Sequence, residues 1–98
     1  FCANSNNRGC KAYYFRGDEE SKKLGVKILE EIERDINIKN KGVREGDFYL
    51  LKNLNTSSLI IELGYLSNLE EEKKFSDKRF IKQFSEAIGK GILQYFEY

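Results

Sequence analysis

The longest regular pattern in the chain is a stripe of apolar residues that recurs about every four positions after Asp18. The stripe consists of Leu24, Ile28, Leu29, Ile32 and Ile36, with Glu and Lys on the opposite positions. A repeat close to 3.6 residues is typical of an amphipathic helix. Asp18 is its predicted N-cap, and Glu19 and Glu20 fall in the first turn, where the helix dipole favours negative charge. Gly25 either packs closely against a neighbouring backbone or is simply tolerated.

A second apolar stripe runs almost to the end of the chain. Its members are Phe80, Ile81, Phe84, Ala87, Ile88, Gly91, Ile92 and Tyr95. This spacing predicts a second amphipathic helix, with Asp77 as its cap. Gly89-Lys90-Gly91 falls inside that helix and lacks the spacing and the following Ser or Thr of a phosphate-binding loop. We therefore interpret these glycines as sites of helix packing.

Three short segments have the composition of strands. They are Ala12-Tyr13-Tyr14-Phe15, Phe48-Tyr49-Leu50-Leu51 and Leu59-Ile60-Ile61-Glu62-Leu63. The first two are aromatic, which suits a pleated surface, and the third is a continuous apolar run that predicts a strand buried on both faces. The polar segments 37–47 and 53–58 are predicted to be connections, and 64–68 a turn that leads into a short charged helical turn at 70–72.

Alternation of strands with amphipathic helices predicts an α/β fold, in which helices form a layer on a sheet. We assign residues 1–98 to one domain, because the chain has no internal repeat and is short for a single domain. Three or four short strands and two helices leave at least one edge or face of the sheet uncovered. We therefore expect this domain to be partial, completed by more chain or by a partner.

Charge and composition exclude several classes of function. Lys and Arg number 17 against 16 Asp and Glu, so a net charge of +1 gives no electrostatic preference for nucleic acid. The longest aliphatic run, Leu59-Ile60-Ile61, is far below the roughly 18 apolar residues that span a bilayer, and no signal peptide opens the chain. We predict neither a nucleic-acid partner nor a membrane partner. Since the chain has no Met, we expect its biological start to lie upstream of Phe1.

The chain also has no His. A Ser-His-Asp site, a Cys-His site and a histidine-rich zinc site therefore cannot form within this chain alone. Any catalysis must use carboxylates, thiols or residues from outside the chain. Cys2 and Cys10 lie in a segment rich in Asn and Gly, and both a disulfide and two free thiols stay open.

Two residues are candidates for chemistry. Glu62 is the one charge inside an apolar strand run, where an unpaired carboxylate suits a general base or a metal-assisting acid. A structural ion pair with Lys or Arg explains the position equally well. If this segment is a strand, Cys2 and Asn4 point to the same face. Cys2 could bind a metal as a thiolate, or it could be a small buried apolar residue.

Five blocks of sequence resemble, in content and order, the zinc-dependent N-acetylmuramoyl-L-alanine amidases of the Amidase_3 type. The blocks are Phe1-Cys2-Ala3-Asn4-Ser5, Gly9 to Phe15, Lys41-Gly42-Val43-Arg44, Asp47 to Lys52, and Leu59 to Asn68. The last is the most specific, because the family has a buried strand that ends in Glu-Leu-Gly-Phe followed by Ser-Asn. On this resemblance Glu62 is the catalytic glutamate, and the chain is the C-terminal half of a mixed α/β sheet layered by helices.

The chain departs from that family at several positions. The family's third zinc-binding His falls on Cys2, which makes Cys2 a degenerate metal ligand. The first zinc-binding His and the zinc-binding Glu belong to an N-terminal half that this chain does not contain. The Arg of the family's Asn-Arg-Gly segment is Lys41 here, and the Pro before the catalytic strand is Ser57. The chain alone therefore lacks a full zinc site.

The resemblance implies a hydrolase that cleaves the amide bond between N-acetylmuramic acid and L-alanine of peptidoglycan, with zinc as cofactor. It also implies action outside the cytoplasmic membrane at a bacterial cell wall, as an autolysin, with peptidoglycan as partner and the missing N-terminal half or another protein completing the domain. A non-catalytic remnant that binds peptidoglycan or a protein is the alternative. A generic α/β domain unrelated to the cell wall is a third interpretation.

Overall fold

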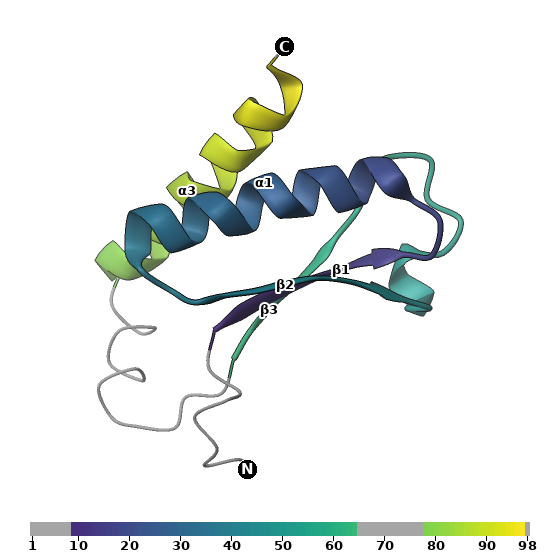
Figure 1. The fold of residues 1–98 in the computed structure, drawn as a ribbon, viewed down its shortest axis with the longest axis horizontal. Coiled ribbons are helices and arrows are strands. Elements are labelled where there is room, and N and C mark those ends of the chain that lie inside the picture. Colours follow the sequence, from purple (N-terminus) through teal and green to yellow (C-terminus); the bar gives the residue numbers. More distant parts are fainter. Residues whose placement is uncertain (1–8, 65–77, 98) are drawn as a thin grey trace.

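A computed structural model describes residues 9–64 and 78–97. Its elements in chain order are β1 (Cys10–Phe15), α1 (Glu19–Ile36), β2 (Asn40–Gly46), the short 3₁₀ turn η2 (Tyr49–Leu51), β3 (Ile60–Leu63) and α3 (Lys78–Phe96). The sheet has the order β2-β1-β3, with β2 parallel and β3 antiparallel to the central strand (Figure 1). The predicted α/β fold with a mixed sheet is confirmed.

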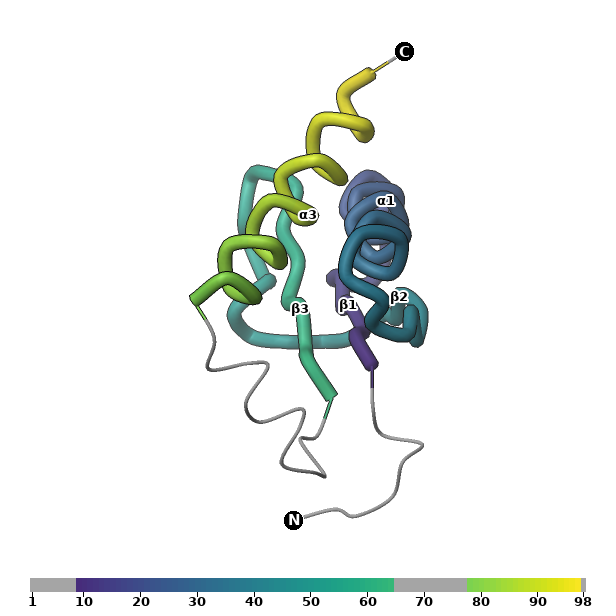
Figure 2. The backbone as a smooth tube through the Cα atoms, turned by 90° about the vertical axis from the view of Figure 1, so that its left-hand side faces the viewer, coloured from purple at the N-terminus to yellow at the C-terminus, as the bar shows by residue number. Residues whose placement is uncertain are grey.

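Both helices lie on one side of this sheet. In Figure 2, α1 lies over β1 and β2, and α3 lies beside α1. The core between the layers contains Cys10, Ala12, Ile28, Leu29, Ile32, Ile36, Ile38, Phe80 and Ala87. Along β1 the buried residues alternate with half-buried ones, because successive side chains of a strand point to opposite faces. One face of β1 is therefore packed under the helices, and we call the other the open face.

The predicted start of α1 is confirmed in detail. The Asp18 carboxylate accepts a hydrogen bond from the backbone N–H of Ser21 at 3.1 Å and a second from the Ser21 hydroxyl at 2.6 Å. The same hydroxyl accepts a hydrogen bond from the backbone N–H of Ser58 at 2.8 Å. Ser21 is fully buried, so it joins the first turn of α1 to the chain just before β3. At its other end α1 stops at Asn37, which adopts the left-handed conformation that commonly ends helices.

Glycines allow the layers to approach closely. A Cβ on Gly25 would stand 3.2 Å from a methyl of Leu59 and 3.3 Å from one of Val43, which confirms close packing, although the contact is with side chains. A Cβ on Gly91 would stand 2.6 Å from the Cα of Ile28, so α3 lies directly against the backbone of α1. The packing interpretation thus holds at Gly91, whereas Gly89 has no atom within 4 Å of a Cβ.

Two predicted elements were wrong. The segment 37–47 is not only a connection, because residues 40–46 form β2 and pair with β1. Its composition, with two glycines and several charges, hides a strand that is held by backbone hydrogen bonds rather than by apolar alternation. Residues 48–51 are not a strand: residues 49–51 form η2, in which Leu51 is buried while Tyr49 and Leu50 are exposed.

The third strand was predicted correctly in position but not in burial. In β3, Ile60 and Ile61 are half-buried, and Glu62 and Leu63 are exposed. The physical reason is that β3 is an edge strand of the described sheet, with helices packed on one face only. The predicted Asp77 cap, most of the turn at 64–68 and the helical turn at 70–72 lie outside the described residues.

Candidate functional site

Glu62 lies on the open face, at the edge of the sheet. In the antiparallel pairing of β1 with β3, Glu62 is opposite Lys11, and Ile60 is opposite Tyr13. Residues opposite each other across a ladder share a face, so Lys11, Tyr13 and Glu62 are displayed on the side that the helices leave uncovered. Within residues 9–64 and 78–97, the geometry therefore places the candidate carboxylate on the face that neither helix covers.

Two side chains of β1 contact the Glu62 carboxylate. Its Oε1 lies 3.7 Å from the Lys11 ammonium nitrogen and accepts a long hydrogen bond of 3.5 Å from the Tyr13 hydroxyl. The Glu62 side chain is 52% exposed, so this ion pair is weak and solvated. The ion pair considered from the sequence is thus present. It leaves the carboxylate accessible, which keeps a chemical role open.

Backbone hydrogen bonds fix the register that brings these residues together. The N–H of Gly64 donates to the carbonyl of Gly9 at 2.5 Å and continues the β1–β3 ladder past Glu62. On the other side, the N–H of Cys10 donates to the carbonyl of Lys39 at 2.9 Å, where β2 begins. The start of β1 is therefore held on both sides, next to the carboxylate.

Cys10 lies on the covered face directly behind this site. Its side chain is fully buried and is a free thiol. Burial, and in second place the nearby charge of Glu62, raise the pKa of the Cys10 thiol from 9.0 to about 11. At neutral pH the sulfur is protonated, which makes it a poor nucleophile and a poor metal ligand.

The predicted metal ligand Cys2 lies outside the described residues. Within residues 9–64 and 78–97, no group of three or more His, Cys, Asp or Glu side chains could hold a metal ion. A catalytic zinc usually has three protein ligands, so this part of the chain does not by itself fit that ion.

Sequence reasoning missed the basic and aromatic residues that surround the open face around Glu62. The open face carries Lys11 and Tyr13, which alternate with the buried residues of β1. It also carries Arg44, because Arg44 of β2 is opposite Tyr13. The Phe48 ring packs edge-on against Tyr13 at 5.0 Å between centroids. The alternation of buried and polar residues along β1 was the signal for this face, but β2 could not be placed beside it without recognising residues 40–46 as a strand.

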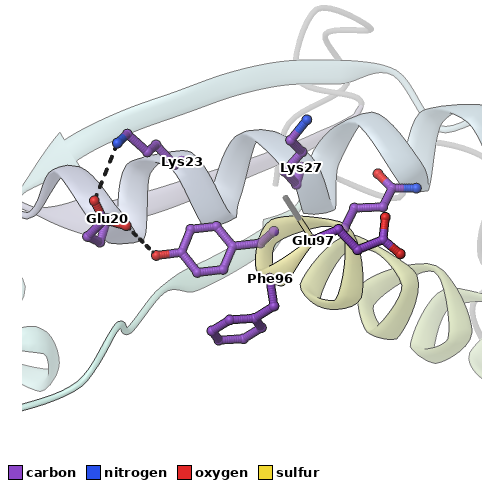
Figure 3. A pocket seen from close by; sticks show the side chains of 7 residues that line it. Glu20, Lys23, Lys27, Phe96 and Glu97 are labelled. Atoms are coloured by element: carbon purple, nitrogen blue, oxygen red, sulfur yellow. Dashed lines mark hydrogen bonds and ion pairs between the residues drawn. The ribbon is translucent and has the colours of Figure 1, made fainter.

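A hollow away from Glu62 lies where the end of α3 crosses the start of α1 (Figure 3). The Tyr95 hydroxyl donates a 2.5 Å hydrogen bond to Glu20, and Lys23 lies 3.3 Å from the same carboxylate. The Tyr95 hydrogen bond lowers the pKa of Glu20, and it raises that of Tyr95. These contacts join the two helices, and none of the residues proposed from the sequence for catalysis or metal binding lines this hollow.

Comparison with protein-family models places this chain in a known family. The model of the N-acetylmuramoyl-L-alanine amidase family matches residues 2–94. The chain belongs to this family, as the sequence blocks around Glu62 indicated.

Curated relatives have matching names. The probable cell wall amidase LytH of Staphylococcus epidermidis is 29% identical over 92 residues, which are 94% of this chain and 31% of that protein. The germination-specific N-acetylmuramoyl-L-alanine amidase of Bacillus subtilis is 30% identical over 89 residues, which are 90% of this chain and 38% of that protein. The chain thus spans about a third of the length of these relatives.

Solved structures agree with the fold. The CwlD amidase of Clostridioides difficile, solved in complex with the GerS lipoprotein, has a TM-score of 0.84 and 35% identity over 94% of this chain and 48% of that one. The amidase AmiC2 of Nostoc punctiforme has a TM-score of 0.78 and 28% identity over 97% of this chain and 52% of that one. The chain corresponds to about half of each of these amidase structures.

Proposed function

We propose that the complete protein hydrolyses the amide bond between N-acetylmuramic acid and L-alanine in peptidoglycan, with Glu62 as its catalytic carboxylate. Family membership supports the reaction class. The single observation that carries the residue assignment is the position of Glu62 on the open face of the sheet, half exposed and next to Lys11 and Tyr13. A carboxylate that only stabilised the fold would gain little from so solvated an ion pair.

In this proposal Glu62 moves protons. Its carboxylate accepts a proton from the water whose oxygen attacks the lactyl carbonyl carbon, and the acid so formed gives that proton to the amide nitrogen as the C–N bond breaks. The products are a glycan with a free lactyl carboxylate and a stem peptide with a free amine. Lys11 and Tyr13 hold the carboxylate in place while its charge changes.

The test is the Glu62→Gln substitution in the complete protein, with release of stem peptide from purified peptidoglycan as the measurement. We expect turnover to fall by about two to four orders of magnitude, because the amide has nearly the same shape but cannot accept the proton. Asp47→Asn is the matched control, since Asp47 is also an exposed acid paired with a base, Arg16 at 2.7 Å. Unchanged turnover in Glu62→Gln would assign the reaction to another group.

We propose zinc as the cofactor, with Cys2 as the one ligand position in this chain. The resemblance supports zinc, and further ligands would come from the rest of the catalytic domain. Dialysis of the complete protein against a chelator is expected to remove a metal that elemental analysis identifies as zinc. Cys2→His is expected to raise zinc affinity in a competition titration. Equal affinities would remove Cys2 from the ligand set.

We propose further that the protein acts at the bacterial cell wall, outside the cytoplasmic membrane, with peptidoglycan as partner. The relatives named cell wall amidases support this location. Neither described helix is both long and apolar enough to cross a bilayer. A protein that completes or assists the domain is a second proposed partner, since a similar amidase was solved together with a lipoprotein. Cell fractionation and co-purification test these two points.

A further inference from the structure

Basic side chains gather on the open face, from β1 next to Glu62 and from β2 on the other side of β1. Arg44 of β2 is directly opposite Tyr13 of β1, two residues along from Lys11. Lys11 is in turn opposite Glu62 of β3. Because β1 is the central strand, the cations on β1 and β2 lie on the inner side of the edge carboxylate. We call Lys11, Lys41 and Arg44 the basic row.

An irregularity in the pairing of β2 with β1 brings Lys41 into this row. The register shifts between Cys10 and Ala12, so that two residues, Lys41 and Gly42, face the single residue Lys11. Gly42 has φ of +94°, a conformation that suits glycine, and its N–H is held by the Asn40 side chain at 2.9 Å. Bulges of this kind re-aim side chains and are common beside active sites.

The methylene groups of Lys41 cover the start of β1. A Cβ on Gly9 would stand 2.8 Å from Cγ of Lys41, so the lysine stem occupies the space that a side chain at position 9 would need. Gly9 directly precedes β1, so this lysine stem lies at the start of that strand. Arg44 donates a 3.1 Å hydrogen bond to the carbonyl of Lys41, which ties the two basic residues together.

The row keeps like charges close to one another. The pKa of Lys41 is lowered, first because its side chain is partly removed from water and then because Lys11, Lys39 and Arg44 repel its charge. The chain as a whole has a net charge of only +1, so this concentration is local. Positive charge is thus concentrated on the open face, on the strand next to Glu62 and on the strand beyond it.

We propose that the basic row binds a carboxylate of the stem peptide and so holds the substrate on the open face that carries Glu62. This inference rests on the proposed function and adds a substrate-recognition site to it. A peptide carboxylate fits because Arg and Lys both donate to oxygen anions, and Arg can do so with two parallel hydrogen bonds. The edge-on pair of Tyr13 and Phe48 supplies an apolar surface beside the row for the rest of the peptide.

The basic row is too short to bind along an extended polyanion. An extended acidic polymer or a nucleic acid requires basic residues along a surface, whereas these cations occupy the start of two adjacent strands. A single carboxylate matches that extent. We therefore expect recognition of a single charge on the peptide rather than of total substrate charge.

The experiment compares two soluble muropeptides in the complete protein, one with free stem-peptide carboxylates and one with the same carboxylates amidated. Lys41→Gln and Arg44→Gln are each expected to raise KM for the free acid about threefold to tenfold, with kcat little changed, and to leave KM for the amidated peptide as it was. Lys41→Arg keeps the positive charge, so its KM for the free acid should equal that of the unaltered protein. Lys27→Gln, the same change on the exposed side of α1, is the control.

Binding is measured separately in the Glu62→Gln protein by calorimetry with the free-acid muropeptide, so that recognition is tested even without turnover. Weaker binding on adding Lys41→Gln or Arg44→Gln supports the basic row. Equal affinity with and without these substitutions, or equal losses for the free and amidated peptides, would overturn it. Failure of the proposed function looks different, because then the unaltered protein releases no stem peptide while its binding still responds to the basic row.

Discussion

Cys10 and Glu62 show how one strand pair gives neighbouring residues opposite environments. Cys10 points into the helix layer and is fully buried, while Glu62 points to the open face and is half exposed. They are close enough for the glutamate charge to add to the effect of burial on the thiol pKa. The alternation of side chains along the paired strands therefore places an unreactive thiol and an accessible carboxylate on opposite faces of the same part of the sheet.

The raised pKa of Cys10 predicts a loss of stability in alkali. The folded state keeps the thiol protonated up to about pH 11, whereas the unfolded chain releases the proton near pH 9. Between these values the unfolded state binds fewer protons, so the free energy of unfolding falls as pH rises. The drop attributable to Cys10 is on the order of 2 kcal/mol. Urea unfolding from pH 8 to 11 should show a steeper decline in the natural protein than in Cys10→Ala, and equal slopes would contradict it.

At the scale of elements, apolar periodicity predicted both helices but not β2. A helix shows its buried stripe in the sequence, and those of α1 and α3 were correctly placed. In β2 (Asn40–Gly46), Val43 packs against the core, and the rest of the strand is held through its backbone pairing with β1. Backbone hydrogen bonding is almost independent of side-chain type, so no sequence pattern revealed this strand.

This omission also limited what could be predicted of the site. Glu62 was identified from the sequence because a charge inside an apolar run is conspicuous. Lys41 and Arg44 looked like ordinary loop residues as long as segment 37–47 was a connection. Their position on the same face of the sheet as Glu62 depends on a parallel pairing between segments about 30 residues apart, and on a bulge at Gly42. Long-range register of this kind is not recorded in local composition.

The cap of α1 gives a prediction for this element. Ser21→Ala removes the hydroxyl that joins Asp18 to the N–H of Ser58, and leaves that N–H without its partner. We expect the free energy of unfolding to fall by about 1 to 3 kcal/mol, as for other part-buried groups that lose a hydrogen bond. Ser85→Ala, at an exposed position of α3, is expected to change it by less than about 0.5 kcal/mol. Chemical denaturation followed by circular dichroism measures both.

At the scale of the whole molecule, the two helices form one layer, and the distance between them is set by a small residue. Gly91 brings α3 against the backbone of Ile28, and the buried Glu31 accepts hydrogen bonds from Arg34 at 2.6 Å and from Gln94 at 2.7 Å at the same interface. Lys90 adds an ion pair with Asp35 at 3.1 Å. The helix layer is therefore held by close backbone contact together with a satisfied polar network.

Two glycines of α3, which are two residues apart and therefore lie on different faces of the helix, test this packing. Gly91→Ala would place a methyl group 2.6 Å from the Cα of Ile28, so we expect a loss of about 1 to 3 kcal/mol as α3 is pushed away. Gly89→Ala meets no atom within 4 Å, and alanine favours helix over glycine, so it should stabilise the protein by up to about 1 kcal/mol. Thermal melting of the two variants should shift in opposite directions. A shift in the same direction would show that the contact at Gly91 does not set the spacing.

The alternation along β1 also bears on how such a protein can change over evolutionary time. Side chains on the helix side of β1 pack in the core, and on the proposed function those on the open face contact the ligand. Both sets come from the same six-residue strand. A substitution at an even-numbered position of β1 therefore acts mainly on stability, whereas on the proposed function one at Lys11 or Tyr13 acts mainly on the substrate site. Stability and ligand recognition can then change along separate mutational routes, provided that no insertion or deletion shifts the strand by one residue and exchanges the two sets.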